Sequence, residues 1–362
     1  MQPLKPIDPP KVGPYRLLGR LGAGGMGVVY LGKSPTADLF AIKMITHGLA
    51  GDDEFRARFA AEVETLRTVS GTRVARLERA DLDADPPWLA VEFVSGRSLQ
   101  TQVEVNGPLD ERTGAMLGAL LVEGLRSVHA ARLVHRDLKP ANIMLGPYGP
   151  VVIDFGLAVL RERDKHLTGT GLPVGTLAYM SPEQARGERD LTTATDVYAL
   201  GATLVYALTR HTIFAQGNAI AMLKRIDDPD DLPVTTGVPA SLAALIDGML
   251  GYEPATRPTL DSVFDRLIDV AIADGVGAET VRADLAQRTY VDDSLNLTDE
   301  ALQPEAEDSD TDSLDDDPTR VDTPSRKQDS EPEPKAHLQR PAPDVAWLAD
   351  EMRTAYARRT AL

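Results

Sequence analysis

The chain has 362 residues, with 38 Lys and Arg against 55 Asp and Glu, which gives a formal net charge of −17. So acidic a chain lacks the basic footprint that binding to nucleic acid, or to an anionic membrane by charge alone, requires. The absence of cysteine excludes disulfides, thiolate metal sites and a cysteine nucleophile, and no apolar run is long enough to span a membrane. We therefore expect a soluble, cytoplasmic protein.

The acidic charge is concentrated near the C-terminus. Residues 289–335 contain 16 acidic and 4 basic residues, a net charge of −12, whereas residues 336–362 carry +1 and residues 1–288 carry −6. The charge pattern therefore divides the chain into a mildly acidic body and a strongly acidic tail.

The body begins with a proline-rich leader and a strand-rich segment. Residues 1–14 contain five prolines and are predicted to be extended. From Tyr15, short β-rich runs alternate with glycines and turn residues, which predicts a meander of antiparallel strands. From residue 52 the apolar residues recur at helical spacing, and a further strand pair is expected around residue 77 and over 88–94.

After Gly96 the pattern is mainly helical. Apolar residues recur at helical spacing in four segments, at 117–128, 197–208, 242–250 and 263–268. Strands followed by helices predict an α+β fold with two lobes, of which the first is small and β-rich and the second is larger and helical.

The C-terminal part changes composition twice. The segment 274–343 is rich in carboxylates and prolines and poor in apolar residues. We predict that it is disordered, because it buries too little surface to offset its ordering entropy. Residues 344–362 place apolar residues near one face and predict a short amphipathic helix, which could dock on the body or a partner, or be marginally helical when free.

A glycine-rich segment lies between two of the predicted strands. Gly22, Gly24 and Gly27 allow a tight turn whose backbone N–H groups can approach phosphate oxygens. An ordinary glycine hairpin has the same pattern. A dinucleotide-binding fold is disfavoured, because Val28 and Val29 continue as a strand and do not begin a helix.

Lys43 follows these glycines by 16 residues, on the next predicted strand. Its ammonium group could lie beside a polyphosphate, or it could face solvent on an edge strand. A lysine that faces phosphate needs an anion to hold it. Glu62, on the following predicted helix, is a candidate for that anion, although it could also lie on a solvated helix face.

Two further motifs decide between these interpretations. The sequence reads HRDLKPAN from His135 and DFG from Asp154. With these motifs the chain resembles the eukaryotic-like (Hanks-type) Ser/Thr protein kinases of bacteria. The resemblance covers about residues 15–270, and the glycine-rich loop, AIK, GT, SPE, DVYALG and RP also occur in the family's order.

The resemblance implies a bilobal protein kinase fold over residues 15–273, with an N-lobe at 15–94 and a C-lobe at 95–273. It also implies transfer of the γ-phosphoryl group of Mg-ATP to Ser and Thr hydroxyls of proteins, with Mn²⁺ able to substitute for Mg²⁺. Lys139, together with Thr176 after Gly175, is typical of Ser/Thr kinases and not of tyrosine kinases.

The family's catalytic roles carry over to matching residues. Asp137 would orient the substrate hydroxyl and accept its proton, and Lys139 would steady the γ-phosphate. Thr176 would lie between Asp137 and Lys139 and form hydrogen bonds with them. Lys43, held by Glu62, would contact the α- and β-phosphates.

The resemblance also assigns the metal and the nucleotide. Asp154 would bind Mg²⁺ between the β- and γ-phosphates, and Asn142 would bind a second Mg²⁺. The ATP-binding positions that it implies are Leu21, Gly22, Ala23, Gly24, Gly25, Met26, Gly27, Val28, Val29, Ala41, Lys43, Glu92, Val94 and Met144. Among them, Val29, Ala41 and Met144 would sandwich the adenine, and the backbone of Glu92 and Val94 would form hydrogen bonds with it at the hinge between the lobes. The pairs and stacks that it implies within the fold are Glu183 with Arg257, and His135 with Phe155 and Leu66.

Regulation can be predicted from the same resemblance. Arg136 precedes the catalytic aspartate, as in kinases that are switched by phosphorylation of the activation loop. Thr168 and Thr170 lie where related bacterial kinases autophosphorylate, so we predict that they are phosphorylated in trans by a second molecule. The segment 70–87 departs from the family's pattern, because it lacks the usual His-Pro turn, and this leaves the helix–strand geometry there open.

The tail repeats one short pattern, TYVD from Thr289 and TRVD from Thr319. Threonine with aspartate three residues later resembles the phosphothreonine motif that forkhead-associated domains bind, or it is a coincidence in a tail rich in Asp and Thr. The carboxylates could aid solubility or occupy a basic substrate groove. Two hypotheses for the function therefore remain: an active kinase, or a kinase-fold scaffold that binds partners through its acidic tail.

Overall fold

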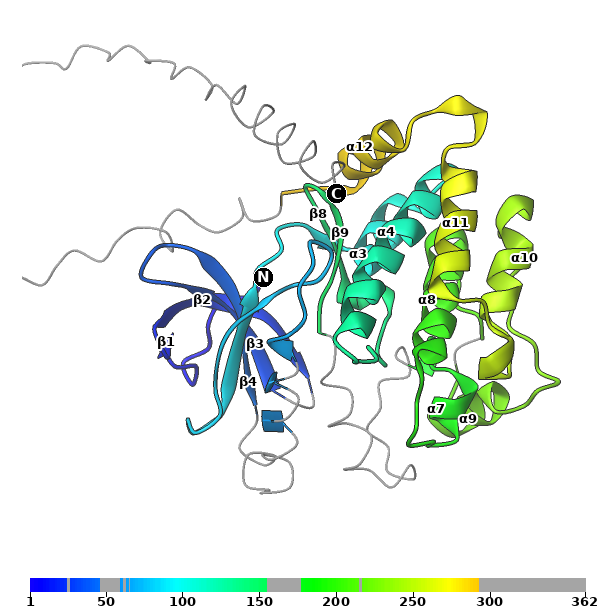
Figure 1. The fold of residues 1–362 in the computed structure, drawn as a ribbon. Helices are drawn as coiled ribbons and strands as arrows, with labels where there is room; N and C mark the ends of the chain where they lie inside the picture. The colour runs from blue at the N-terminus through cyan, green and yellow to red at the C-terminus, as the bar shows by residue number, and fades with distance from the viewer. Residues whose placement is uncertain are drawn as a thin grey trace, which may run out of the picture. The chain divides into compact units, whose positions relative to one another are not determined.

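The computed structural model describes residues 1–24, 27–45, 59–60, 63–64, 66–154, 177–214 and 217–292. These residues belong to one compact unit, Met1–Pro304. The predicted α+β fold with two lobes is confirmed: strands dominate the N-terminal part and helices the C-terminal part (Figure 1). The predicted helix at 344–362 and the TRVD segment lie outside the described residues.

The N-lobe is built on a six-stranded antiparallel sheet. Its strands are β1 (Lys11–Val12), β2 (Tyr15–Gly24), β3 (Gly27–Lys33), β4 (Leu39–Ile45), β5 (Leu77–Asp81) and β6 (Trp88–Glu92), in the order β1-β2-β3-β4-β6-β5. One face of the sheet buries Tyr15, Ile42 and Trp88, and the rings of Tyr15 and Trp88 meet edge to face with centroids 5.8 Å apart. These large side chains supply a core for a lobe that has few residues.

The proline-rich leader packs on this sheet. Gln2 N donates to Arg20 O over 2.9 Å, and Val12 is buried in β1. Asp8 accepts hydrogen bonds from the Arg20 guanidinium and, over 2.8 Å, from the Tyr30 hydroxyl. The leader is thus part of the N-lobe and covers the edge of the sheet beside β2.

The C-lobe is mainly helical. Its elements are β7 (Arg97–Ser98), α3 (Leu99–Asn106), α4 (Glu111–Ala130), η1 (Pro140–Asn142), β8 (Ile143–Gly146), β9 (Gly149–Val152), α7 (Pro182–Ala185), α8 (Thr193–Thr209), α9 (Ala219–Ile226), α10 (Ala240–Met249), η2 (Pro254–Thr256), α11 (Leu260–Ala271), η3 (Ala273–Gly275) and α12 (Ala278–Thr289). Helix α4 is central, because it packs against α8, α11, α12 and β9. At Gly118 an added Cβ would lie within about 3 Å of Leu204 and Leu267, so this glycine allows α8 and α11 to approach α4 closely.

The segment that lacks the usual His-Pro turn is anchored by Arg73. Ala75 N donates to Val152 O over 2.9 Å, and Val152 N donates to Arg73 O over 2.8 Å. The buried Arg73 guanidinium donates to Tyr148 O over 2.6 Å and lies 3.6 Å from Glu123. Burial lowers the pKa of Arg73. These contacts of Arg73 and Ala75 therefore hold the start of the segment 70–87 on β9, on the β8–β9 turn and on α4.

The structure corrects the predicted start of the disordered tail. The composition predicts that residues 278–289 belong to the tail, but they form α12, which buries Val281 and Leu285 against α4, β8 and β9. Two apolar residues four positions apart suffice here because the C-lobe offers an apolar surface to receive them. Thr289 is 1% exposed and its hydroxyl donates to Leu285 O, which argues against the predicted modification of Thr289 in the folded domain.

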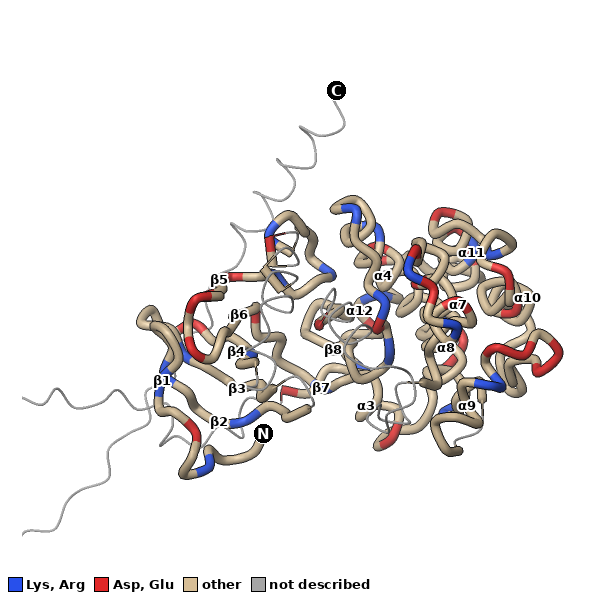
Figure 2. The backbone as a smooth tube through the Cα atoms, turned by 90° about the horizontal axis from the view of Figure 1, so that it is seen from below, with Lys and Arg blue, Asp and Glu red and all other residues tan. Residues whose placement is uncertain are grey.

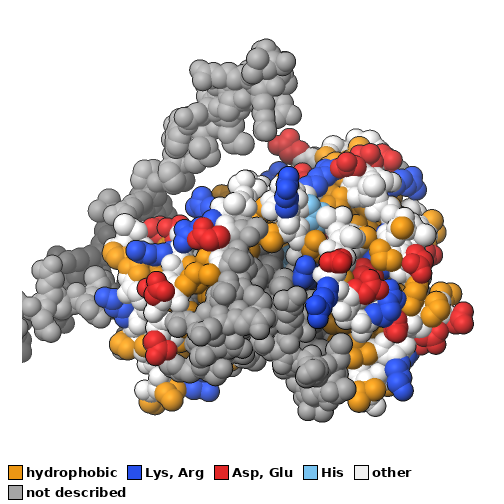
Figure 3. All heavy atoms as spheres, turned by 60° about the horizontal axis from the view of Figure 1, so that its bottom comes forward, with side chains coloured by type: hydrophobic (Ala, Val, Ile, Leu, Met, Phe, Trp, Pro, Cys, Tyr) orange, Lys and Arg blue, Asp and Glu red, His pale blue; other side chains and the backbone are white. Residues whose placement is uncertain are grey.

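The described surface mixes both charge signs. Figure 2 shows Lys and Arg interspersed with Asp and Glu along the described elements, and Figure 3 shows the same mixture on one face. This distribution agrees with the mildly acidic charge of residues 1–288. Among the residues that the structure describes, no helix combines the length and the apolar character that crossing a membrane demands.

Candidate active site

The loop that carries the HRD motif is held by one buried carboxylate. Asp196, in the first turn of α8, is inaccessible to solvent and accepts hydrogen bonds from His135 N over 2.8 Å and Arg136 N over 2.9 Å. His129 Nε2 lies 2.7 Å from the same carboxylate. Gln184 donates to Arg136 O over 2.8 Å, so Arg136, with a φ of 64°, is fixed on both sides. Asp196 therefore sets the position of Asp137, which directly follows Arg136 in the chain.

Asp137, Lys139 and Asn142 form one hydrogen-bonded group. Lys139 Nζ lies 2.9 and 2.8 Å from the two carboxylate oxygens of Asp137. Asn142 Nδ2 donates to Asp137 O over 2.9 Å and to Asp137 Oδ2 over 3.2 Å. The short helix η1 begins with a proline and places Asn142 on the same side as Asp137. The group thus combines a proton acceptor with an adjacent positive charge.

Asp154 lies at the end of the β8–β9 hairpin and meets a lysine from the N-lobe. Lys43 Nζ on β4 is 3.3 Å from Asp154 Oδ1. Desolvation disfavours the ionised form of the Asp154 carboxyl, whose side chain is 41% exposed, but the charge of Lys43 and its hydrogen bond outweigh this effect and lower the pKa of Asp154. Ile153 N donates to Asn142 O over 2.9 Å, which brings Asp154 beside Asn142.

The glycine-rich turn leaves room above it. Gly22 pairs with Val29, and Gly24 pairs with Gly27, across β2 and β3. A Cβ added at Gly22 or Gly24 would meet nothing within 4 Å, so the fold itself does not require glycine at these positions. A ligand that binds close to the backbone does require glycine there, because a side chain would occupy its place. Gly27 is different, because an added Cβ would lie 1.8 Å from Met44 O.

The apolar residues predicted to contact adenine come from both lobes. Val29 on β3, Ala41 on β4 and Met144 on β8 are all half-buried, and Val94 packs beside Gly146 of the β8–β9 hairpin. Half-buried apolar residues on both lobes suit a planar, mostly apolar ligand group. The other predicted ATP-binding residues with described side chains are Leu21, Ala23, Val28 and Glu92.

Several predicted site residues lie outside the described residues. They are Gly25, Met26, Glu62, Phe155, Thr168, Thr170 and Thr176. The predicted pair between Glu183 and Arg257 is confirmed, with Arg257 Nη1 2.7 Å from Glu183 Oε1. Of the predicted stack, His135 and Leu66 are both buried.

Asp196 and Arg73 are two structurally important residues for which the sequence predicts no role. A signal for Asp196 exists in the sequence, since it is an acidic residue in the first turn of an otherwise strongly apolar helix. Such a carboxylate needs buried donors, but the spacing of the residues does not reveal which ones. Arg73 has no comparable signal, because its partners Tyr148 and Glu123 are distant in sequence and unremarkable in type.

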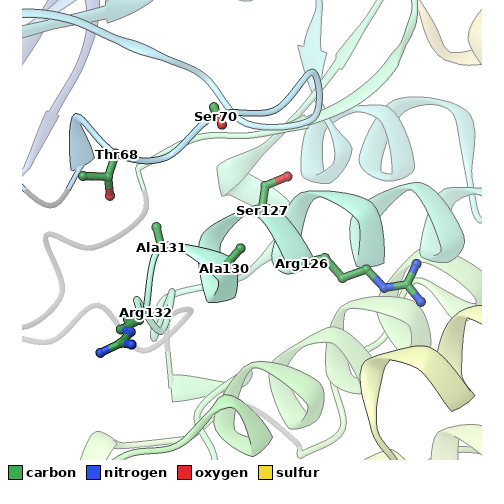
Figure 4. A pocket seen from close by; sticks show the side chains of 7 residues that line it. All are labelled: Thr68, Ser70, Arg126, Ser127, Ala130, Ala131 and Arg132. Atoms are coloured by element: carbon green, nitrogen blue, oxygen red, sulfur yellow. The ribbon is translucent and has the colours of Figure 1, made fainter. Parts of the chain in front are cut away.

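A separate cavity of about 550 Å³ lies away from this site. Its lining residues are Thr68, Ser70, Arg126, Ser127, Ala130, Ala131 and Arg132, between the segment that leads to β5 and the C-terminal end of α4 (Figure 4). It contains none of the residues predicted to bind ATP or metal.

Comparison with known proteins identifies the same family throughout. The sequence profile of the protein kinase domain matches residues 15–267. The probable serine/threonine-protein kinase PkwA of Thermomonospora curvata is 44% identical over 268 residues, which cover 74% of this chain and 35% of PkwA. The serine/threonine-protein kinase AfsK of Streptomyces coelicolor is 45% identical over 254 residues, covering 69% of this chain and 31% of AfsK. This chain therefore spans about a third of the length of these relatives.

Among solved structures, the PknI kinase domain of Mycobacterium tuberculosis has a similar fold. Its TM-score is 0.56, its sequence identity is 22%, and the match covers 72% of this chain and 97% of that domain. At this identity the likeness concerns the fold alone.

Proposed function

The chain belongs to the protein kinase family, and we propose that it is an ATP-dependent protein serine/threonine kinase. The observation that carries the proposal is the convergence of Asp137, Lys139 and Asn142 with the Lys43–Asp154 pair. The choice of Ser and Thr hydroxyls as acceptors is supported by Lys139, two residues after Asp137, and by the names of the relatives described above.

In the proposed reaction, the hydroxyl oxygen of a Ser or Thr substrate attacks the γ-phosphorus of ATP. A new P–O bond forms, the bond between the γ-phosphorus and the β–γ bridging oxygen breaks, and the hydroxyl proton passes to the Asp137 carboxylate. Lys139, 2.8 and 2.9 Å from that carboxylate, supplies positive charge where the phosphoryl group passes. ADP and a phosphorylated protein are the products.

The donor set suits Mg²⁺. The Asp154 carboxylate has a lowered pKa and is therefore ionised at neutral pH. The Asn142 amide nitrogen is occupied by Asp137, which leaves the amide oxygen as the group that can bind a cation. Mg²⁺ prefers such oxygens and is usually held by one or two carboxylates together with substrate phosphates. When bound, Mg²⁺ supplies charge that neutralises the phosphate oxygens; Mn²⁺ could replace it.

The glycine-rich turn would hold the nucleotide's phosphates. The open space above Gly22 and Gly24 lets phosphate oxygens reach the backbone N–H groups. Lys43 lies on β4, which is paired with β3 on one side and β6 on the other. The backbone of Lys43 is therefore held in place, and its ammonium group would contact the phosphates from there. Glu62 is the anion proposed to hold this ammonium group.

Incubation of the purified chain with radiolabelled Mg-ATP and a generic protein substrate tests the proposal. The variants Lys43→Met and Asp137→Asn should each transfer phosphate at least about 100-fold more slowly, the loss expected for a catalytic charge or base. Lys224→Met, at an exposed position on α9, is the matched control and should retain the wild-type rate. A wild-type chain that binds ATP but labels nothing would favour the alternative of a kinase-fold scaffold.

Activation by phosphorylation of Thr168 and Thr170 in trans is a further part of the proposal. Its support is Arg136, which directly precedes Asp137 and whose backbone is fixed by Asp196 and Gln184. The inactive Asp137→Asn chain, offered as substrate to the wild type, should gain phosphate at these threonines. The double variant Thr168→Ala/Thr170→Ala should gain none there, and unchanged activity of that variant would contradict the proposed activation.

Thr319 remains the candidate position for a forkhead-associated partner. Its support is the TRVD sequence in the acidic tail. A synthetic phosphopeptide that spans Thr319 should bind such a domain, and equal binding of the unphosphorylated peptide would dismiss the idea.

A further inference from the structure

The segment 276–292, here called the C-terminal strap, extends beyond the part of the chain that matches the kinase family. The family match ends at residue 267. Helix α12 within the strap buries Val281 and Leu285 on one face, and both side chains join the apolar core of the C-lobe. The strap is therefore built into the C-lobe, on α4 and the β8–β9 hairpin (Figure 1).

Polar contacts fix the C-terminal end of α12. Arg288 Nη1 lies 3.0 Å from Asp110 Oδ2, the N-cap carboxylate of α4. Gln102 Nε2 on α3 donates to Arg288 O over 3.4 Å. These contacts hold the end of α12 between α3 and the start of α4, and they direct the following residues towards the connection between the lobes.

The last described residues of the strap reach that connection. Ser95 Oγ donates to Asp292 Oδ1 over 3.0 Å and lies 3.3 Å from the Tyr290 hydroxyl. Ser95 directly follows Val94, one of the two hinge residues predicted to bind adenine. On its other side, Gly96 has a φ of 132° and an added Cβ would lie 2.2 Å from Leu145 O, so the backbone there is pressed against β8.

We propose that Tyr290 and Asp292 are positioning residues for the nucleotide site, because they hold the hinge through the Ser95 hydroxyl. The hinge backbone is then fixed by β6 at Glu92, by β8 at Gly96 and by the strap at Ser95. Loss of the third fixed point lets Val94 shift relative to adenine and weakens nucleotide binding. The proposal rests on the proposed use of ATP and adds a contribution from residues outside the matched kinase domain.

Nucleotide affinity of the full chain tests this role. Calorimetric titration with Mg-ADP should give an affinity about 3- to 10-fold weaker for Ser95→Ala and for Asp292→Ala, the size expected from one net hydrogen bond. The double variant should bind Mg-ADP as tightly as the single variant with the lower affinity, because both changes remove the same contact. Ser95→Thr keeps the hydroxyl and should retain most of the wild-type affinity. Asp265→Ala, at an exposed position on α11, is the matched control and should match the wild type.

Kinetic constants separate a positioning role from a general loss of structure. The KM for ATP should rise in the two single variants, while kcat at saturating ATP stays close to the wild-type value. Unchanged Mg-ADP affinity in both variants, or losses that add in the double variant, would overturn the proposal. Because the titration needs no phosphoryl transfer, it decides the role of the strap even if the wild type proves inactive as a kinase.

Discussion

The buried pair between Glu183 and Arg257 allows a quantitative prediction. The Arg257 side chain is 0% exposed and that of Glu183 is 3% exposed, and two parallel contacts of 2.7 and 2.8 Å join them. Thr195 donates to the same carboxylate over 2.8 Å, and Arg257 lies over the Tyr198 ring. The pair links α7 and the start of α8 with the residue that follows η2, which lies 74 positions after Glu183 in the sequence.

Replacement of one partner leaves the other charge buried and unpaired. We expect Arg257→Met to lower the free energy of unfolding by about 3–5 kcal/mol, because the Glu183 carboxylate then lacks its counter-charge. Glu183→Leu should cost a similar amount. The double variant Glu183→Leu/Arg257→Met should cost at least about 2 kcal/mol less than the sum of the two, because no buried charge remains.

Urea unfolding followed by circular dichroism measures these differences. An unchanged slope of the unfolding free energy against urea concentration would show that the denatured states of the variants are comparable. An Arg257→Met variant within about 1 kcal/mol of the wild type would refute the reasoning, since it would place the pair in the range of exposed salt bridges. Additive losses in the double variant would refute it as well.

The same pair predicts a pH dependence. Burial alone would raise the pKa of Glu183, but the hydrogen bonds and charge of Arg257 outweigh burial and lower this pKa. The unfolded-state pKa of glutamate is about 4.3, so the contribution of the pair is complete above that pH and is lost as the pH falls towards the lower folded-state pKa. The stability difference between the wild type and Arg257→Met should therefore shrink below about pH 4.

Four single substitutions test other parts of the structure. Gly27→Ala should lower the melting temperature, because its Cβ would lie 1.8 Å from Met44 O, whereas Gly24→Ala meets no atom within 4 Å and should raise the KM for ATP without changing the melting temperature. Asp196→Asn should reduce kcat more than it changes the KM for ATP, because it disturbs the loop of the proposed catalytic residue. Leu285→Ala should cost about 2–5 kcal/mol in urea unfolding, the range for a buried leucine; a cost near zero would mean that α12 does not belong to the C-lobe.

Local patterns in the sequence predict much of this molecule. The strands from Tyr15 to Ile45 and the helices α4, α8 and α11 follow from apolar spacing and turn residues, which act over a few positions. The short motifs around Asp137 and Asp154 identify the family, because the residues that would contact one substrate lie close together in the chain at set spacings.

Other features depend on surfaces that the chain creates only when it folds. Residues 278–289 contain too few apolar residues to predict a buried helix, yet α12 forms because α4 and the β8–β9 hairpin offer a complementary apolar surface. Arg73 is buried because Tyr148 O and Glu123, far away in sequence, supply its partners. Likewise, nothing near Ser95 in the sequence indicates a contact with Asp292, 197 residues later. The energy of such contacts depends on burial and geometry between distant segments, and local composition carries no information about either.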